Sequence, residues 1–346
     1  MKAILYDQFG GPVYPDRVAD PDPREGSVVV AVKASGICRS DWHGWMGHDA
    51  DIRELPHVPG HELAGEIAAV GKGVRGFRVG DRVTVPFVAG CGVCPDCREG
   101  NPQVCPDQSQ PGFTHWGSFA EYVRIDYAES NLVHIPDALD FESAAILGCR
   151  FSTAFRATLV QGAAQAGQWV VVFGCGGVGL SAIMIAAARQ ARVIAVDIRP
   201  EALALAARLG AEVLLQTGEG EVREAIYQNT GRGAHLTIDA LGKASVCREA
   251  IESLRRGGRH VQVGLLAGAD FQPRLPMERV ISRELQILGS HGMQAGHFPQ
   301  MLEMISAGQL APEKLITRRI ALEEVPPILT GMDDFAAPGV TVINRF

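Results

Sequence analysis

Four cysteines that stand close together constrain the fold of this chain more than any other feature. They are Cys91, Cys94, Cys97 and Cys105, in the spacing C-x2-C-x2-C-x7-C. Four thiolates can close a tetrahedron around one zinc ion and leave no position for a substrate, which is the pattern of a structural site. Separate buried thiols or disulfides would leave the clustering unexplained. We therefore predict a structural-zinc lobe at about residues 88–108.

Composition limits the class of protein. The 346 residues, 47% of them hydrophobic, are enough for about two domains with separate cores. The net charge of −7 and the scattered basic residues argue against a nucleic-acid partner. Charged residues interrupt every apolar run, so no membrane partner is expected. Eight cysteines without a secretory leader favour thiols and bound metal in a reducing compartment, and we expect a cytoplasmic protein.

Two patterns of secondary structure follow one another. Up to about residue 150, short alternating strands with frequent glycine predict a β-rich domain. The strands expected there are 28–33, 65–70, 82–86 and 119–125. From residue 169 onward, β-branched runs alternate with helical segments, which predicts an α/β domain with a doubly wound parallel sheet. The last residues lack a core of their own, so we expect 1–150 and 291–346 to form one domain and 151–290 the other.

A glycine-rich turn directly follows the buried strand that begins at Trp169. It reads Gly174-Cys175-Gly176-Gly177-Val178-Gly179, and a helix is expected to begin within it. In a G-x-G-x-x-G turn the glycines allow a tight bend, close approach of a pyrophosphate and close helix packing, and the helix N-terminus faces the phosphates. The four glycines are therefore predicted to bind a dinucleotide.

Asp197 ends the next expected strand and indicates which dinucleotide is bound. A carboxylate at this place can hydrogen-bond the adenosine ribose hydroxyls and would repel a 2′-phosphate, which favours NAD over NADP. Arg199 keeps NADP as the alternative, because a nearby guanidinium can accept that phosphate. A packing turn followed by a solvated aspartate is the interpretation without function.

Cys38, His61 and Cys149 lie outside the four-cysteine lobe. Three such ligands with a fourth position open are the pattern of a catalytic zinc site. Each residue taken alone can equally be a buried thiol or a core histidine. Because the three lie far apart in sequence, spacing alone does not identify them as a set.

The segment around His61 resembles the zinc signature of the medium-chain alcohol dehydrogenase family. Gly60-His61-Glu62-x2-Gly65-x5-Gly71-x2-Val74 fits that signature throughout. The order of parts is also similar: Cys-Arg-Ser-Asp at 38–41, this signature, the four-cysteine lobe, a late cysteine and the dinucleotide turn. The resemblance covers nearly the whole chain and implies a GroES-like β-rich catalytic domain joined to a Rossmann domain.

The resemblance implies a role for each residue of the metal centre. Cys38, His61 and Cys149 become the ligands of a catalytic zinc. Glu62 matches an acid beside the metal that binds it transiently, and Asp41 matches a partner that fixes the tautomer of the zinc-bound histidine. With the structural lobe, two zinc ions per subunit are expected.

The resemblance also implies how protons and the cofactor are handled. Ser40 and His43 match a proton relay from the alcohol to solvent. Arg39, Val178 and Thr153 match contacts to the pyrophosphate and the nicotinamide of the cofactor. Family members often have an arginine near the C-terminus that meets the pyrophosphate, but Gly339-Val340-Thr341-Val342 contains none. The alternatives are a weaker affinity for the cofactor and a contact that Arg39 makes alone.

Aromatic residues are candidates for the substrate pocket. Phe87 matches an aromatic wall in the family. The other candidates, suited to bulky or aromatic alcohols, are Trp42, Trp45, Phe113 and Trp116. Simple packing or a subunit contact is the alternative for each tryptophan.

These parts together predict a zinc-dependent, NAD-linked alcohol dehydrogenase. It would reversibly oxidise primary or secondary alcohols to aldehydes or ketones, by hydride transfer from a zinc alkoxide. Cys149 favours this over a polyol or amino-alcohol dehydrogenase, in which glutamate is common at the matching position. A non-catalytic nucleotide-binding relative is the other alternative. The resemblance further suggests a homotetramer or a dimer.

Overall fold

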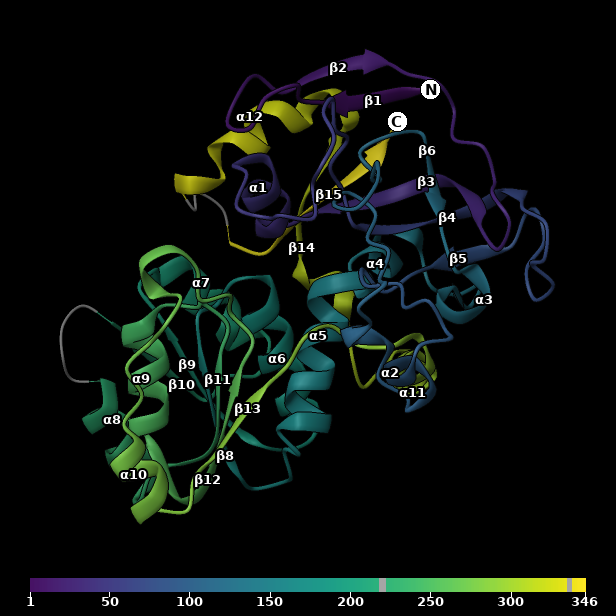
Figure 1. The fold of residues 1–346 in the computed structure, drawn as a ribbon. Helices are drawn as coiled ribbons and strands as arrows, with labels where there is room; N and C mark the ends of the chain where they lie inside the picture. Colours follow the sequence, from purple (N-terminus) through teal and green to yellow (C-terminus); the bar gives the residue numbers. More distant parts are fainter. Residues whose placement is uncertain (218–221, 335–337) are drawn as a thin grey trace. The chain divides into compact units, whose positions relative to one another are not determined.

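The computed structural model describes residues 1–217, 222–334 and 338–346, and the chain divides into two compact units (Figure 1). Unit 1 comprises Met1–Ser152, Gly292–Gly308 and Ile316–Phe346. Unit 2 comprises Thr153–His291 and Gln309–Leu315. The segment Gln309–Leu315 was expected in the first domain but groups with the second, where the backbone N–H of Ala311 donates to Met184 Sδ at 3.4 Å.

Unit 2 is built on a six-stranded sheet in which every neighbouring pair is parallel. Its strands are β8 (Trp169–Phe173), β9 (Arg192–Asp197), β10 (Val213–Gln216), β11 (Ala234–Asp239), β12 (Leu254–Gln262) and β13 (Gln286–Gly289). The strand order is β10-β9-β8-β11-β12-β13. From β8 the chain adds β9 and β10 on one side and then returns to add β11, β12 and β13 on the other side. This is the doubly wound order of a Rossmann fold, as predicted. The central strand β8 is buried along its whole length, which explains its continuous apolar sequence.

Helices cover both faces of this sheet, with α6 on one side and α8 and α9 on the other (Figure 1). They are α6 (Gly177–Ala188), α7 (Pro200–Arg208), α8 (Val222–Thr230), α9 (Ala244–Glu252) and α10 (Met277–Ser282). The core of unit 2 includes Val171, Ile194 and Ile251, all fully buried. In α6 every residue from Gly179 to Ala186 is buried, which its mostly apolar sequence allows.

Unit 1 is β-rich. Its main sheet runs β14 (Ile316–Ala321), β15 (Val340–Arg345), β3 (Val28–Ile37), β4 (Glu62–Val70), β5 (Arg82–Thr84) and β7 (Val133–His134), and β6 (Tyr122–Ile125) also pairs with β3. Strands β1 (Lys2–Leu5) and β2 (Tyr14–Arg17) form a separate antiparallel pair. The long antiparallel pair β3–β4 ends where residues 36 and 62 face each other, which brings the segments around Cys38 and His61 together.

The helices of unit 1 are short. They are α1 (Arg39–Trp45), α2 (Pro95–Arg98), α3 (Ala128–Asn131), α4 (Phe141–Ala145), α11 (Phe298–Ser306) and α12 (Val325–Thr330). Helix α5 (Ser152–Phe155) crosses the boundary between the units and lies between two π-helical turns, η2 (Leu147–Phe151) and η3 (Arg156–Gln161). The 3-10 turns are Pro102–Val104, Gly268–Asp270, Ala295–His297, Pro312–Leu315, Leu322–Glu324 and Gly331–Asp334. Among the described residues, no helix is long and apolar enough to cross a membrane.

Candidate functional site

Four buried side chains of unit 1 bring metal-binding atoms together. They are Cys38, His61, Glu62 and Cys149, and one ligand atom from each lies within 4.8 Å of all the others. Cys38 precedes helix α1, His61 directly precedes β4, Glu62 is the first residue of β4, and Cys149 lies in the π-helical turn η2. π-Helical turns are rare and occur often at functional sites. The structure therefore assembles all three predicted catalytic-zinc ligands with the predicted neighbouring acid.

Asp41 fixes the orientation of His61. Its Oδ1 lies 2.7 Å from His61 Nδ1, and the carboxylate also accepts the backbone N–H groups of Cys38 at 2.8 Å and Gly60 at 3.2 Å. The other ring nitrogen, His61 Nε2, is buried and has no hydrogen-bond partner among the residues that the structure describes. A buried polar atom without a partner is unfavourable, and a metal ion would satisfy this one.

The electrostatics of the group favour a cation. The hydrogen bond with Cys149 lowers the pKa of Cys38 well below its ordinary value, and the same contact raises the pKa of Cys149. Burial alone would lower the pKa of His61, but the Asp41 carboxylate and Cys38 outweigh it and raise it well above its ordinary value. Two thiolates and an imidazole are a ligand set that zinc prefers, so the residues present fit this metal.

Arg150 is a part of this site that the sequence analysis missed. Its Nε donates to Glu62 Oε1 at 2.9 Å, and its Nη2 donates to Glu62 Oε2. Both side chains are buried, with 8% and 0% of their surfaces exposed. Burial raises the pKa of Glu62, whereas the guanidinium opposes that rise. Burial would lower the pKa of Arg150, but the Glu62 carboxylate outweighs burial and raises it, which favours the charged guanidinium.

The predicted relay residues lie on helix α1. The Sγ of Cys38 is 3.8 Å from Ser40 Oγ, so Ser40 adjoins the ligand group. His43 Nδ1 is 3.1 Å from the Nδ1 of His48, an exposed residue. Arg39, predicted to bind the cofactor, stacks over the ring of Trp42 at 3.8 Å and donates to a main-chain carbonyl of its own unit.

Two aromatic rings adjoin His61. The ring of Phe87 lies 6.0 Å from the imidazole, and the ring of Phe113 lies 5.3 Å from it, both measured between centroids. Trp116, the other predicted pocket residue, packs instead beside the small cluster of Ala3, Leu5, Val58 and Ala120, and its Nε1 donates to Pro56 O at 3.1 Å. Trp42 and Trp45 belong to the hydrophobic core of unit 1. Phe113 is thus the better aromatic candidate beside the metal group.

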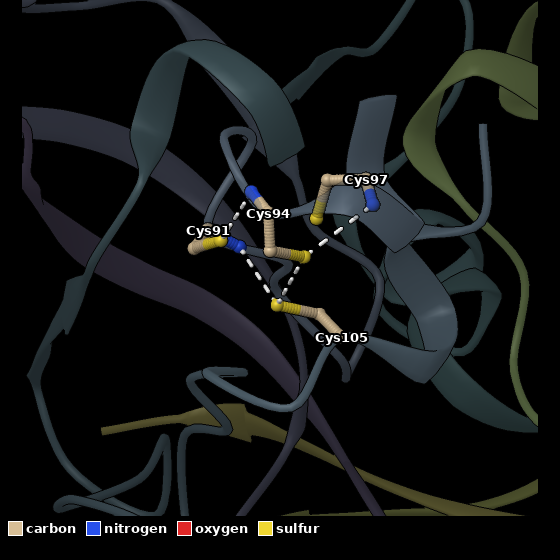
Figure 2. Close-up of side chains that lie close together, drawn as sticks. All are labelled: Cys91, Cys94, Cys97 and Cys105. Atoms are coloured by element: carbon tan, nitrogen blue, oxygen red, sulfur yellow. Dashed lines mark hydrogen bonds between the residues drawn. The ribbon is translucent and has the colours of Figure 1, made fainter. Parts of the chain in front are cut away.

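The four cysteines of the lobe turn their sulfurs toward one another (Figure 2). The backbone N–H of Cys94 donates to Cys91 Sγ, and that of Cys97 donates to Cys94 Sγ, both at 3.4 Å. Backbone donors lower the pKa of Cys91 to about 7, whereas burial raises that of Cys97 to about 12. Donors aimed at sulfur stabilise thiolates, and four clustered thiolates need a cation. The lobe therefore also fits zinc.

The lobe is fastened to unit 1 by hydrogen bonds. The Asn131 side chain accepts the backbone N–H of Gly90 at 3.0 Å and donates to the carbonyl of the same residue at 2.9 Å. Gln294, from the C-terminal part of the unit, donates to Gly100 O at 3.1 Å. Binding of a metal ion in the lobe would therefore be coupled to the packing of the rest of unit 1.

The glycine turn of unit 2 has the geometry that a dinucleotide requires. Gly174 adopts φ +91°, a left-handed conformation that favours glycine. A Cβ added to Gly179 would lie 1.7 Å from Gly174 O, so helix α6 packs directly on the turn. A Cβ added to Gly176 would meet no atom within 4 Å, which leaves the backbone open to a ligand. These are the three roles expected of the fingerprint glycines.

Asp197, at the end of β9, is buried and adjoins this turn. Its Oδ2 accepts the backbone N–H of Cys175 at 2.6 Å, and its Oδ1 accepts that of Arg199 at 2.9 Å. Each carboxylate oxygen retains a further acceptor position for a ribose hydroxyl. Thr153, the predicted nicotinamide neighbour, has a buried Oγ1 with no hydrogen-bond partner in the part of unit 2 that the structure describes.

Comparison with known proteins identifies the family. Residues 24–137 match the alcohol dehydrogenase GroES-like domain, and residues 177–307 match the zinc-binding dehydrogenase domain. The chain is 38% identical over 291 residues, 84% of each chain, to an alcohol dehydrogenase of Geobacillus stearothermophilus. It is 30% identical to a sorbitol dehydrogenase of Halalkalibacterium halodurans, over 94% of each chain. The solved alcohol dehydrogenase TADH from Thermus sp. ATN1 superposes over 100% of both chains with a TM-score of 0.91 at 30% identity.

This chain belongs to the zinc-dependent medium-chain alcohol dehydrogenase family. The predicted fold class, a GroES-like domain with a Rossmann domain, is confirmed by the same matches and by the solved structures. The members of this family to which the chain is similar are named as alcohol dehydrogenases, which are oxidoreductases.

Proposed function

We propose that this protein is a zinc-dependent, NAD-linked dehydrogenase of primary or secondary alcohols that also catalyses the reverse reduction of aldehydes and ketones. One observation carries the proposal: the free Nε2 of His61 is buried beside two cysteine sulfurs and faces no protein partner among the described residues. A nucleotide-binding protein without catalysis has no need of such a group, and this weighs against the non-catalytic alternative.

Cys38, His61 and Cys149 would hold the metal, and three protein ligands leave a fourth position for the substrate oxygen. Zinc bound there supplies Lewis acidity, which makes an alcohol more acidic and polarises a carbonyl. Asp41 keeps the Nδ1 of His61 engaged so that Nε2 faces the metal. Phe87 and Phe113 would line the apolar side of the substrate position.

Alcohol oxidation releases one proton and one hydride. We assign the proton to Ser40 Oγ, which adjoins the ligand group, and from there to His43 and solvent. NAD bound to unit 2 would supply the redox chemistry as the acceptor of the hydride. Gly174, Gly176, Gly177, Val178 and Gly179 would bind its pyrophosphate and nicotinamide, with Arg39, Thr153, Asp197 and Arg199 as the further contacts.

The substrate class follows from the ligand set. Cys149 as third ligand favours a simple or aromatic alcohol over a polyol. The sorbitol dehydrogenase among the relatives keeps a polyol or an amino alcohol as the second candidate. We also propose that the protein is a homo-oligomer, either a tetramer or a dimer, in the cytoplasm. Light scattering of the purified protein would measure its oligomeric state.

The proposal is tested by following reduction of NAD, beside NADP, with purified zinc-loaded protein over primary, secondary, aromatic and polyol alcohols. We expect turnover with NAD on simple or aromatic alcohols. A chelator should abolish this turnover, and added zinc should restore it. Preference for polyols would select the second candidate. NAD binding without turnover on any alcohol or carbonyl, in a protein that holds no zinc at Cys38, would support the non-catalytic alternative.

Asp197→Asn should change cofactor selectivity. The amide cannot accept the backbone N–H groups of Cys175 and Arg199 as well as a ribose hydroxyl, because it has only one oxygen. Loss of a hydrogen bond to a charged group is worth about 1.5–3 kcal/mol, so kcat/KM for NAD should fall roughly 10–100-fold. The fall for NADP should be smaller, because removing the negative charge also removes repulsion of the 2′-phosphate.

Asp239→Asn is the matched control for this prediction. Asp239 ends β11, on the other side of β8, and its Oδ1 accepts the backbone N–H groups of Leu241 and Gly242 at 2.8 and 3.0 Å. It should destabilise unit 2 without changing the ratio of NADP to NAD activity. An equal change of that ratio in both variants would mean that Asp197 acts only through the fold.

A further inference from the structure

A buried arginine joins the three chain segments that carry the predicted catalytic ligands. The Nη1 of Arg150 donates to Ile37 O at 3.0 Å, while its Nε and Nη2 donate to the two oxygens of Glu62. Each member of this network is the chain neighbour of a ligand: Ile37 of Cys38, Glu62 of His61, and Arg150 of Cys149. One guanidinium thus connects the end of β3, the start of β4 and the turn η2.

The carboxylate of Glu62 accepts three hydrogen bonds from Arg150. Besides the two guanidinium bonds, its Oε1 accepts the backbone N–H of Arg150 at 3.0 Å. A two-pronged arginine–carboxylate contact fixes geometry as well as charge, and lysine cannot reproduce it. A Cβ on Gly36 would lie 2.2 Å from Glu62 Oε2 and 2.7 Å from Arg150 Nη2, so the ion pair rests directly on the backbone of β3.

We propose that Arg150 is a positioning residue that holds the Glu62 carboxylate off the metal, so that the fourth coordination position stays open to substrate. This inference rests on the proposed function, since it presumes a metal at Cys38, His61 and Cys149. Glu62 belongs to the same group of atoms within 4.8 Å, so a carboxylate released from Arg150 is within reach of that metal. A carboxylate in the fourth position closes the site, as in a structural one.

The balance of charges explains why the carboxylate would move. Two thiolates neutralise a divalent ion, and Arg150 neutralises Glu62, so the buried group is neutral without a fourth anionic ligand. Without the guanidinium, a buried carboxylate is left with no counter-charge, which is strongly unfavourable. The metal ion is then the nearest cation that can satisfy it.

The test uses the full-length protein loaded with Co²⁺ and titrated with azide, without cofactor or alcohol, while the visible d–d absorption is followed. The closed four-cysteine lobe has no position for azide, so an azide-dependent change reports on the other site. Arg150→Met should weaken azide binding at least about tenfold, the scale of lost partners around metal ligands. The double variant Arg150→Met, Glu62→Gln should return to within about threefold of the wild-type affinity, because it lacks the competing carboxylate.

Arg124→Met is the matched control. Arg124 also lies in unit 1 and forms an ion pair with Asp126 at 2.8 Å, and the variant should bind azide as the wild type does. Wild-type affinity in Arg150→Met, or no recovery in the double variant, overturns the inference. If Arg150→Met does not load cobalt, Arg150→Lys decides: weaker azide binding that Glu62→Gln relieves supports the inference, and unchanged binding overturns it. Wild-type protein without any azide-dependent band would instead count against the catalytic metal site itself.

Discussion

His61→Ala abolishes alcohol oxidation while leaving NAD binding intact. The imidazole supplies one of the three predicted ligands, and its buried Nε2 has no hydrogen-bond partner among the described residues. Lewis-acid activation by zinc is worth several kcal/mol, so kcat/KM should fall by about 10³-fold or more. The glycine turn lies in unit 2, whereas His61 lies in unit 1, so the Kd for NAD should change less than about twofold. Steady-state kinetics and NAD titration by calorimetry measure the two effects.

His57→Ala is the matched control for this variant. His57 is a buried histidine of the same unit, its Nε2 also lacks a partner among the described residues, and its ring packs against Tyr6. Its removal should lower stability without loss of metal. Metal analysis should find two zinc ions per chain in the control and one in His61→Ala. Substantial turnover by His61→Ala, or equal loss of metal in both variants, would contradict the assignment of His61 as a ligand.

The strands of the fold could be predicted wherever burial leaves a strong pattern. The expected strand at 28–33 lies within β3, and the apolar run that begins at Trp169 is β8. Strand β13 was missed, because its residues Gln286–Gly289 are mostly exposed at the edge of the sheet and carry no apolar alternation. The short segment Gln309–Leu315 was assigned to the wrong unit because its partner, helix α6, is far away in sequence.

The sequence predicted only those residues of the candidate site that belong to recognisable motifs. Cys38, His61 and Cys149 came from a resemblance, and the structure brings them together because the π-helical turn η2 packs beside the β3–β4 ends. No sequence pattern indicated that Arg150 belongs to the site. Arginine side chains are normally exposed, and this one is buried because it pairs with Glu62, which is far away in sequence. The choice between Phe113 and Trp116 depended on which way each side chain turns in an irregular loop, and sequence carries no period there.

Cys97→Ser destabilises unit 1 before it affects the chemistry. The hydroxyl is a poor zinc ligand, so the lobe should lose its metal, and Cys91, Cys94 and Cys105 would be left clustered without the ion that holds them together. Because Asn131 and Gln294 fasten the lobe to the rest of unit 1, its loosening is transmitted to the unit. Losing a structural metal belongs to the most damaging class of substitution, at about 4 kcal/mol or more, so Tm should fall by roughly 8–16 °C.

Cys247→Ser separates this effect from the general cost of placing a hydroxyl where a thiol was buried. Cys247 is a buried thiol of unit 2 that belongs to neither metal group, and its Sγ lies 4.0 Å from His260 Nε2. It should retain both zinc ions and lower Tm by only a few degrees, the scale of about 1 kcal/mol. Calorimetry with metal analysis makes the comparison.

Because the lobe ligands are separate from Cys38, His61 and Cys149, the fraction of Cys97→Ser that remains folded should retain the catalytic zinc and turn over alcohol at a near-normal rate. An unchanged Tm with two zinc ions retained would show that the four cysteines do not form a structural site, whereas a normal Tm with no turnover would move them into the chemistry.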